Sequence, residues 1–340
     1  MDISNFKNYK MIIFFILVVI TLFGMYYFKD VFMLFFASYV IAASLMPLVD
    51  KLSKKMPRSF VVSLIYLIGF GLFTLILIPL ISLLYKETVL FIKNIPEYFQ
   101  MIMNYLSTTD FMGKKLIEVI NTENALMSSA SFGSTIIDKS INFTVSLIYG
   151  FTIAFTLAII VLYMLLDKSE IKDYFLALFP KNMRNKVKEL SSNISTKVGG
   201  YVVGQLLMMF AVGLITFIGL AIFKLPFSLL IGFIAGVLDI IPIVGPIIAF
   251  GLAIIVVFPK GIAAIVAVCA VFAFAQWSTN TFLKPIVLGK MLDLHPLIII
   301  FAIFAFEKFL GVSGVILAPA IAATVCVLFD ELYVKTINKE

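Results

Sequence analysis

Residues 227–257 have the sequence FSLLIGFIAGVLDIIPIVGPIIAFGLAIIVV, an apolar run in which the only charged residue is Asp239. Pro242, Gly245 and Pro246 follow closely, and a regular helix does not continue through them, because each proline removes a backbone donor and crowds the preceding turn. Inside a bilayer such a break is tolerated only where it is buried in protein or lines a wet cavity. The stretch predicts a discontinuous helix of the kind that forms substrate sites in transporters. The alternative is a loop between two ordinary spans at the membrane edge.

The composition of the whole chain places this run in a membrane protein. Hydrophobic residues make up 62% of the chain and charged residues only 13%, whereas a soluble domain carries about 25% charged residues. Since a spanning helix needs about 20 apolar residues, we predict an all-α polytopic membrane protein with about eight spanning helices. The same pattern predicts broken or re-entrant segments in the C-terminal half of the chain and a small helical extracytoplasmic insert. The predicted spans are 11–28, 31–49, 59–85, 140–166, 198–223, 240–259, 261–283 and 309–329.

Lysine and arginine gather on one side of these spans. They lie before residue 11, between residues 51 and 58, between 168 and 197, and after residue 334. Because cytoplasmic loops carry the excess of basic residues, we expect a multi-pass protein of the cell (cytoplasmic) membrane with both termini in the cytoplasm. The segment 86–139 has no such excess, so it is expected on the opposite side.

These features divide the chain into six parts. Residues 167–197 are expected to form one or two amphipathic helices on the membrane surface, with a break at Pro180. The parts are the first three transmembrane helices (1–85), the extracytoplasmic helical insert (86–139), the fourth transmembrane helix (140–166), the cytoplasmic amphipathic segment (167–197), the C-terminal transmembrane core with broken helices (198–329) and the cytoplasmic tail (330–340).

Several functional classes are disfavoured by what the sequence lacks. The net charge of +7 is spread over short loops and forms no basic stripe with interleaved aromatics, so we expect no nucleic-acid partner. Cys269 and Cys326 lie inside apolar runs, where a thiol behaves as a small hydrophobe, so we expect no metal site. A lone histidine with isolated acids and no phosphate-binding loop predicts neither an enzyme nor an ATP-driven pump, and no cofactor.

A second break is predicted beyond Lys284 and Pro285. Only about ten apolar residues separate Pro296 from Glu307 and Lys308, a stretch too short to cross a membrane. We therefore expect a re-entrant half-helix that returns at residues 306–314. The alternative is one long tilted helix over 296–329 with a charged pair in its middle, which costs about 2.5–3.5 kcal/mol per charge on insertion scales.

Polar residues and helix breakers at the two breaks are the candidates for a substrate or ion pathway. A buried carboxylate is the usual carrier of coupled protons, which points to Asp239 and Glu307. Each has a second interpretation: Asp239 as the cap of the following helix, and Glu307 as an interfacial or oligomer-contact charge. The candidate set is Asp239, Pro242, Gly245, Pro246, Gln276, Thr279, Asn280, Lys284, His295 and Glu307.

Other singled-out residues favour structural roles. His295 is the only histidine and has the chemistry of a proton sensor, but it is also placed to order the turn before Pro296. Small residues four apart permit close helix contact, which predicts helix packing at Gly200 and Gly204 and at Gly232 and Gly236.

The C-terminal half resembles the autoinducer-2 exporter family of bacterial transporters, in its putative permease branch. The strings that carry the resemblance occur in order over about residues 195–325: GGYVVGQ at 199–205, LPF at 225–227, DIIPIVGP at 239–246, LKP at 283–285, LHP at 294–296, Gly311, Gly314 and LAP at 317–319. The chain departs from the family pattern at Thr279, where the family usually carries an acid, and at Glu307 and Lys308, where it tends to have glycines.

The resemblance implies seven or eight helices, a homo-oligomer, and export of a small polar signalling molecule in some members or sodium or lithium/proton antiport in others. Three functions follow. The leading one is a secondary transporter or exporter of a small polar solute, such as an autoinducer-2-like molecule or related metabolite. The alternatives are a sodium (lithium)/proton antiporter and a non-transporting membrane scaffold. The expected partners are the solute, a proton or sodium ion, and the lipid bilayer.

Overall fold

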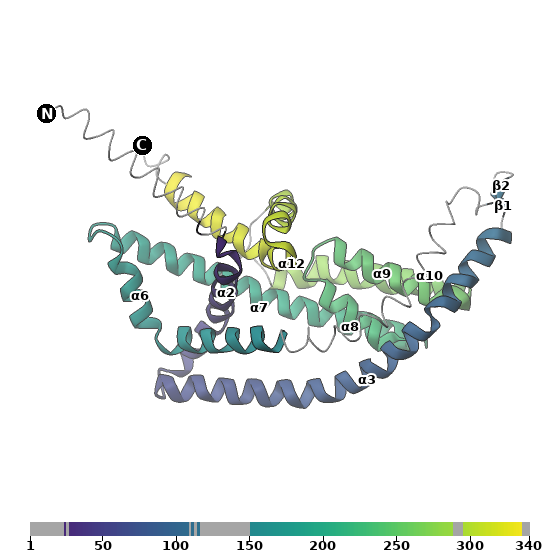
Figure 1. Ribbon diagram of the computed structural model, residues 1–340, viewed down its shortest axis with the longest axis horizontal. Helices are drawn as coiled ribbons and strands as arrows, with labels where there is room; N and C mark the ends of the chain where they lie inside the picture. Colours follow the sequence, from purple (N-terminus) through teal and green to yellow (C-terminus); the bar gives the residue numbers. More distant parts are fainter. Residues whose placement is uncertain are drawn as a thin grey trace, which may run out of the picture. The chain divides into compact units, whose positions relative to one another are not determined.

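The computed structural model describes residues 24, 27–108, 110–111, 114–115, 150–287 and 295–334. These residues are almost entirely helical, which confirms the predicted all-α class. The described strands are β1 (Asp110–Phe111) and β2 (Lys114–Lys115), a two-residue antiparallel pair. The chain forms two compact units: Met1–Pro47 with Thr156–Gly199 and Leu294–Glu340, and Leu48–Phe155 with Gly200–Asp293. Figure 1 labels the elements along the chain.

Four described helices are long and apolar enough to cross a membrane. They are Lys29–Leu52 (α2), Arg184–Ile222 (α7), Ile262–Val287 and Leu297–Phe329. The helix Gly150–Leu166 is a fifth if it is counted together with α6 (Lys168–Ala177), from which it is bent by 82°. The chain is a multi-pass membrane protein. The count of about eight spans stays a prediction, and most of the predicted span 11–28 lies outside the described residues.

The first unit contains a kinked helix, α12 (Pro296–Phe329), followed by a short π-helix, η3 (Asp330–Val334). Gly311 interrupts α12 with φ 62° and ψ −144°, inside the interval where a break was expected. Helical segments on either side of the break meet through Ala302, Ala318 and Ala322. Elsewhere in this unit Gly199 of α7 lies against the backbone of Ala43 in α2, a contact that leaves no room for a larger side chain.

The second unit contains the predicted discontinuous segment. It appears as two short helices, α8 (Ser228–Leu238) and α9 (Val244–Val257), which pack against each other and against α7 and α10 (Ile262–Ser278). At 1.5 Å per residue these helices are about 17 and 21 Å long, so neither alone crosses a hydrocarbon core of about 30 Å. The remaining elements are the 3-10 turn η1 (Phe258–Lys260), the π-helix η2 (Thr279–Leu283) and α11 (Lys284–Val287).

One helix passes through a boundary drawn from the sequence. α3 (Arg58–Thr108) is continuous over 51 residues, despite Pro79 and Pro96, so no structural break separates the predicted span 59–85 from the start of the insert 86–139. The helix continues past residue 85 because its later turns have a packing partner. Phe91 and Tyr105 contact Phe227 and Phe258 at the two ends of the α8–α9 hairpin. Most of the insert lies outside the described residues.

Candidate functional site

The turn between α8 and α9 is tight and strained. The N–H of Val244 donates to the carbonyl of Pro242 over 2.8 Å, closing a three-residue γ-turn around Ile243. Ile243 has φ 69° and ψ −56°, the rare form of this turn, and a β-branched residue at positive φ is an outlier. Strain of this kind costs about 1–3 kcal/mol and collects at functional sites. The surroundings of the turn therefore hold Ile243 at positive φ. Ile243 is also the N-cap of α9, and Asp239 is the C-cap of α8, so the interpretation of Asp239 as the cap of the following helix is wrong.

Gly245 closes the hairpin by close backbone approach. A Cβ atom at this position would run into the carbonyl of Leu238, and the residue is buried. The N–H of Gly245 donates to the carbonyl of Ile241 over 3.0 Å. Only glycine lets α9 start this close to the end of α8, which explains why the break contains a glycine as well as two prolines.

Polar side chains from α7 meet this turn. Gln205 donates from Nε2 to the backbone carbonyl of Asp239 over 3.0 Å, and its amide also interacts with the Asp239 carboxylate. Tyr201, one helical turn earlier and buried, lies near enough to interact electrostatically with the same carboxylate. A carbonyl freed by the end of α8 thus gains the partner that a bilayer does not supply.

The other side of the site is the irregular end of α10. Here the helix widens into the π-helix η2, a feature that often marks functional sites. Lys284 follows it, donates from Nζ to Oδ1 of Asn280 over 2.6 Å and interacts electrostatically with Asp239. The Thr279 side chain is 1% exposed, and its hydroxyl has no hydrogen-bond partner among the described residues. An unpaired buried hydroxyl costs free energy and is a group that a ligand or water satisfies.

Two further candidates meet in a groove between α9 and α10. Gln276 and Pro246 both line it, and the rest of the lining is apolar: Ile247, Phe250, Cys269, Phe272 and Ala273. The groove holds about 310 Å³. A single amide in an apolar groove provides orientation but little affinity for a polar molecule.

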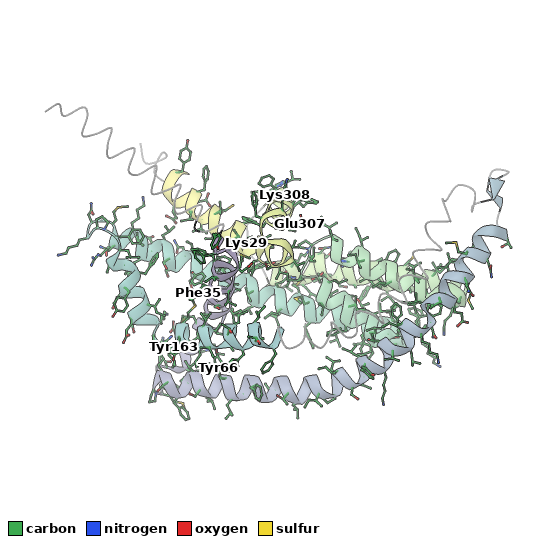
Figure 2. All side chains as sticks on the ribbon, viewed as in Figure 1. Lys29, Phe35, Tyr66, Tyr163, Glu307 and Lys308 are labelled. Atoms are coloured by element: carbon green, nitrogen blue, oxygen red, sulfur yellow. The ribbon has the colours of Figure 1, made fainter. Side chains whose placement is uncertain are left out.

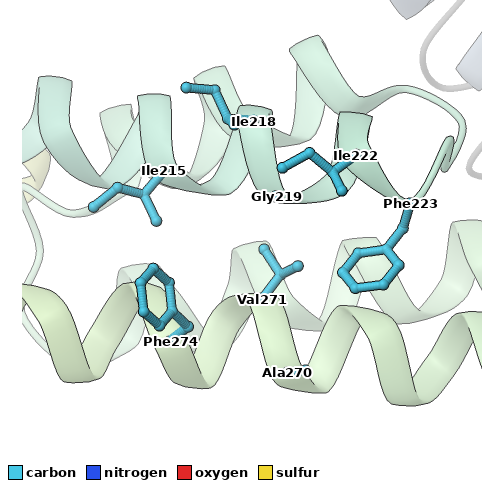
Figure 3. Close-up of a pocket in the computed structure, with 8 residues that line it drawn as sticks. All are labelled: Ile215, Ile218, Gly219, Ile222, Phe223, Ala270, Val271 and Phe274. Carbon is cyan, nitrogen blue, oxygen red and sulfur yellow. The ribbon is translucent and has the colours of Figure 1, made fainter.

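A second groove between α7 and α10 is wholly apolar. Figure 3 shows side chains of the two helices facing each other across it, and it holds about 400 Å³. Its lining is Ile215, Ile218, Gly219, Ile222, Phe223, Ala270, Val271 and Phe274. With no polar group it does not suit a polar solute.

The base of the hairpin is fixed by a residue of α3. Glu87 accepts a hydrogen bond at Oε2 from the N–H of Leu230, over 2.8 Å. Leu230 is in the first turn of α8, whose own N-cap residue, Phe227, makes no side-chain cap. A carboxylate at this position satisfies an otherwise orphaned amide and complements the positive end of the helix dipole.

His295 and Glu307 belong to the other unit. His295 is the N-cap of α12, with Nδ1 accepting from the N–H of Leu297 over 3.3 Å, which is the turn-ordering role. Glu307 and Lys308 are exposed, and in Figure 2 they lie on the part of α12 beside Lys29 of α2. Lys29 donates from Nζ to the carbonyl of Phe309 over 3.4 Å, close to the Gly311 break.

The pair Gly232 and Gly236 packs against a third glycine, Gly213, which the sequence did not single out. A Cβ at Gly232 would come within 2.9 Å of the Gly213 carbonyl, and one at Gly236 within 3.0 Å of the Gly213 Cα. Gly213 therefore lets α7 and α8 pack closely. The role assigned to Gly200 and Gly204 stays a prediction.

Sequence reasoning also missed Tyr201, Gln205 and Glu87 as members of this arrangement. Tyr201 and Gln205 had a readable signal, since two polar residues four apart on an apolar span share one helix face. Glu87 had none, because its partner is a backbone amide of a helix far along the chain.

Comparisons with known proteins identify the family to which the chain is similar. The family described as "AI-2E family transporter" matches residues 15–333. "Putative transport protein YueF" of Bacillus subtilis (strain 168) is 29% identical over 83% of this chain and 79% of its own length. "Putative transport protein YrrI" of the same strain is 26% identical over 91% of this chain and 88% of its own. The "Sodium-lithium/proton antiporter" of Halobacillus andaensis is 24% identical over 66% of this chain and 68% of its own length.

Proposed function

The chain belongs to the AI-2E transporter family, and we propose that it is a secondary transporter that exports a small polar solute across the cytoplasmic membrane. The observation that carries the proposal is the convergence of Tyr201, Gln205, Asp239 and Lys284 at the turn between α8 and α9. The class of solute is an autoinducer-2-like signalling molecule or a related hydroxylated metabolite.

The chemistry of the site supports a polar, hydroxylated solute. Asp239 accepts hydrogen bonds, Lys284 donates them, and the Thr279 hydroxyl and the Gln205 amide do both. Because Asp239 and Lys284 carry opposite charges, the site has little net charge and favours a neutral molecule with several hydroxyl groups. The strained backbone at Ile243 supports a turn with more than one conformation, as alternating access requires.

A flux assay with a matched control tests the proposal. The Asp239→Asn variant, reconstituted in liposomes, is expected to lower flux of a radiolabelled hydroxylated metabolite by about 10-fold or more, because charge-assisted hydrogen bonds contribute about 1.5–3 kcal/mol. Asp173→Asn, on an exposed surface of α6, is the control and should leave flux unchanged. Wild-type flux in a well-inserted Asp239→Asn protein contradicts the proposal and leaves Asp239 with a structural role at the end of α8.

A sodium (lithium)/proton antiporter is the second candidate. Its support is the partly buried carboxylate of Asp239, which interacts electrostatically with Lys284, since a buried carboxylate is the usual carrier of a coupled proton. Liposomes loaded with a pH-sensitive dye separate the two functions. Proton movement driven by sodium or lithium and abolished by Asp239→Asn would replace the solute exporter with the antiporter.

A further inference from the structure

The helix α6 has an apolar face that the described residues leave largely exposed, with Phe179 packed against Phe175 at its end. Ile171, Tyr174, Phe175 and Leu178 follow the spacing of one helix face, and no residue of α6 is buried. Tyr174 and Leu178 are 76% and 80% exposed. A short helix with one open apolar face needs a partner outside its own unit.

The position of α6 indicates what that partner is. It follows directly on the apolar helix Gly150–Leu166 and is bent from it by 82°. The hydrogen bonds continue through the bend, from the N–H of Asp167 to the Tyr163 carbonyl and from the N–H of Ile171 to the Asp167 carbonyl, each 2.9 Å. The sequence predicts a span over 140–166, and a helix that turns by nearly a right angle on leaving such a span runs along the membrane plane. In Figure 1, α6 crosses the direction of the helix before it.

The far end of α6 is also fixed. Arg184, at the start of α7, donates from Nε to the Phe179 carbonyl over 3.1 Å and from its terminal nitrogen to the Ala177 carbonyl over 3.4 Å. These bonds satisfy carbonyls at the helix C-terminus and add a favourable charge there. The apolar face is therefore held in one orientation from both ends.

The charges around the face complement an anionic membrane surface. Lys172 lies on α6 at one edge of the apolar stripe and Glu170 at the other, and Lys181 follows in the loop; all three are exposed. Asp173 is on the opposite side of the helix. Lysines at the edge of an apolar helix face extend their ammonium groups to the phosphates of lipid headgroups while the apolar side chains lie below them.

We propose that α6 is an in-plane membrane anchor. Its face of Ile171, Tyr174, Phe175 and Leu178 inserts into the headgroup region of the cytoplasmic leaflet, and Lys172 and Lys181 bind the headgroups of anionic phospholipids there. The cytoplasmic side follows from the basic residues around α6. This surface is separate from the solute site in the other unit and stands whether or not the proposed solute is correct.

Tryptophan quenching tests the depth of the face. Tyr174→Trp and, as the matched control, Asp173→Trp are made in a Trp277→Phe background, and the full chain is reconstituted in vesicles of phospholipids brominated on their acyl chains. We expect fluorescence at position 174 to be quenched several-fold more by the brominated lipid than at position 173, and less by iodide in the water. Equal quenching at both positions overturns the anchor. Resistance of position 174 to both quenchers also overturns it, since that result identifies a face covered by protein, such as a second copy.

Vesicle composition tests the part played by the lysines. The emission of the Tyr174→Trp protein is compared in phosphatidylcholine vesicles with and without phosphatidylglycerol. A blue shift in anionic vesicles that is lost in the Lys172→Gln/Lys181→Gln double variant supports headgroup binding, whereas Lys260→Gln, in the other unit, is expected to keep the shift. The same emission in neutral and anionic vesicles overturns the anionic preference.

Discussion

Two of the helix breaks among the described residues, the one between α8 and α9 and the one inside α12, are built differently. Between α8 and α9 the backbone turns over Asp239–Ile243. Gln205 of α7 donates to the turn, and Tyr201 and Lys284 interact electrostatically with the Asp239 carboxylate. In α12 the backbone breaks at a single glycine, Gly311, with exposed neighbours and one long hydrogen bond from Lys29.

The difference shows what turns a break into a candidate site. Both breaks free backbone carbonyls, which need partners in a bilayer. At α12 the flexibility of glycine accounts for the geometry. At α8–α9 a non-glycine residue is held at positive φ, and charged and amide side chains converge on the same turn. The α8–α9 arrangement costs more free energy, because a non-glycine residue is strained there. Strain of this kind collects at functional sites, so this break is the better candidate.

The largest expected effect comes from filling the space at the α8–α9 turn. Gly245→Ala puts a Cβ against the Leu238 carbonyl, so we expect it to destabilise the protein by about 3 kcal/mol. Thermal unfolding in detergent measures the loss. Gly251→Ala is the control in the same helix, because nothing lies within 4 Å of its added Cβ. Equal melting temperatures for the two variants would show that the turn is not closed as described.

At the α12 break glycine is required for its backbone conformation and not for lack of space. Gly311 has φ 62°, and an added Cβ would meet nothing within 4 Å. We therefore expect Gly311→Ala to destabilise by about 2 kcal/mol through backbone strain alone. Unfolding in detergent against Gly69→Ala, a helical glycine that also has open space around it, isolates the effect. A stabilised Gly311→Ala would mean that α12 is a regular helix.

Relieving the strain at Ile243 should have the opposite sign. Its side chain is exposed, so Ile243→Gly loses little burial and gains an allowed positive φ. We expect a stabilisation of about 1 kcal/mol, the strain removed less the entropy cost of glycine. Ile247→Gly, an equally exposed residue inside α9, is expected to destabilise by about 1 kcal/mol. If both substitutions destabilise alike, Ile243 is not strained.

The smallest effect is expected at Lys29. The bond from its ammonium to the Phe309 carbonyl is exposed and 3.4 Å long, so Lys29→Met should lower stability by only about 0.5 kcal/mol. The solute flux of this variant is expected to equal that of the wild type. A loss of flux comparable to that of Asp239→Asn would give the α12 break a functional role as well, so the two breaks would no longer differ in function.

Much of this arrangement was predictable, for local reasons. The proline and glycine residues at 242–246 predicted the break after Asp239, because each acts on the backbone near it in sequence. The break in α12 was expected near residues 306–314 from the charged pair and the short apolar run, and it lies at Gly311. The groups that complete the site were not predicted. Tyr201 and Gln205 lie more than thirty residues from Asp239, and no local pattern links them to it.

The sequence by itself determined that this is an all-α, multi-pass membrane protein of the AI-2E transporter family with a helix break at residues 239–246. The length of an apolar run and the backbone chemistry of proline and glycine act locally, so both can be predicted from the sequence alone. Only the tertiary structure decided that Gly213 is the partner of Gly232 and Gly236, that Glu87 caps α8, and that Gln205 reaches Asp239. These contacts depend on which helices are neighbours and on how far each helix is shifted along its axis. Both are set by the simultaneous packing of several helices, which no local stretch of sequence specifies.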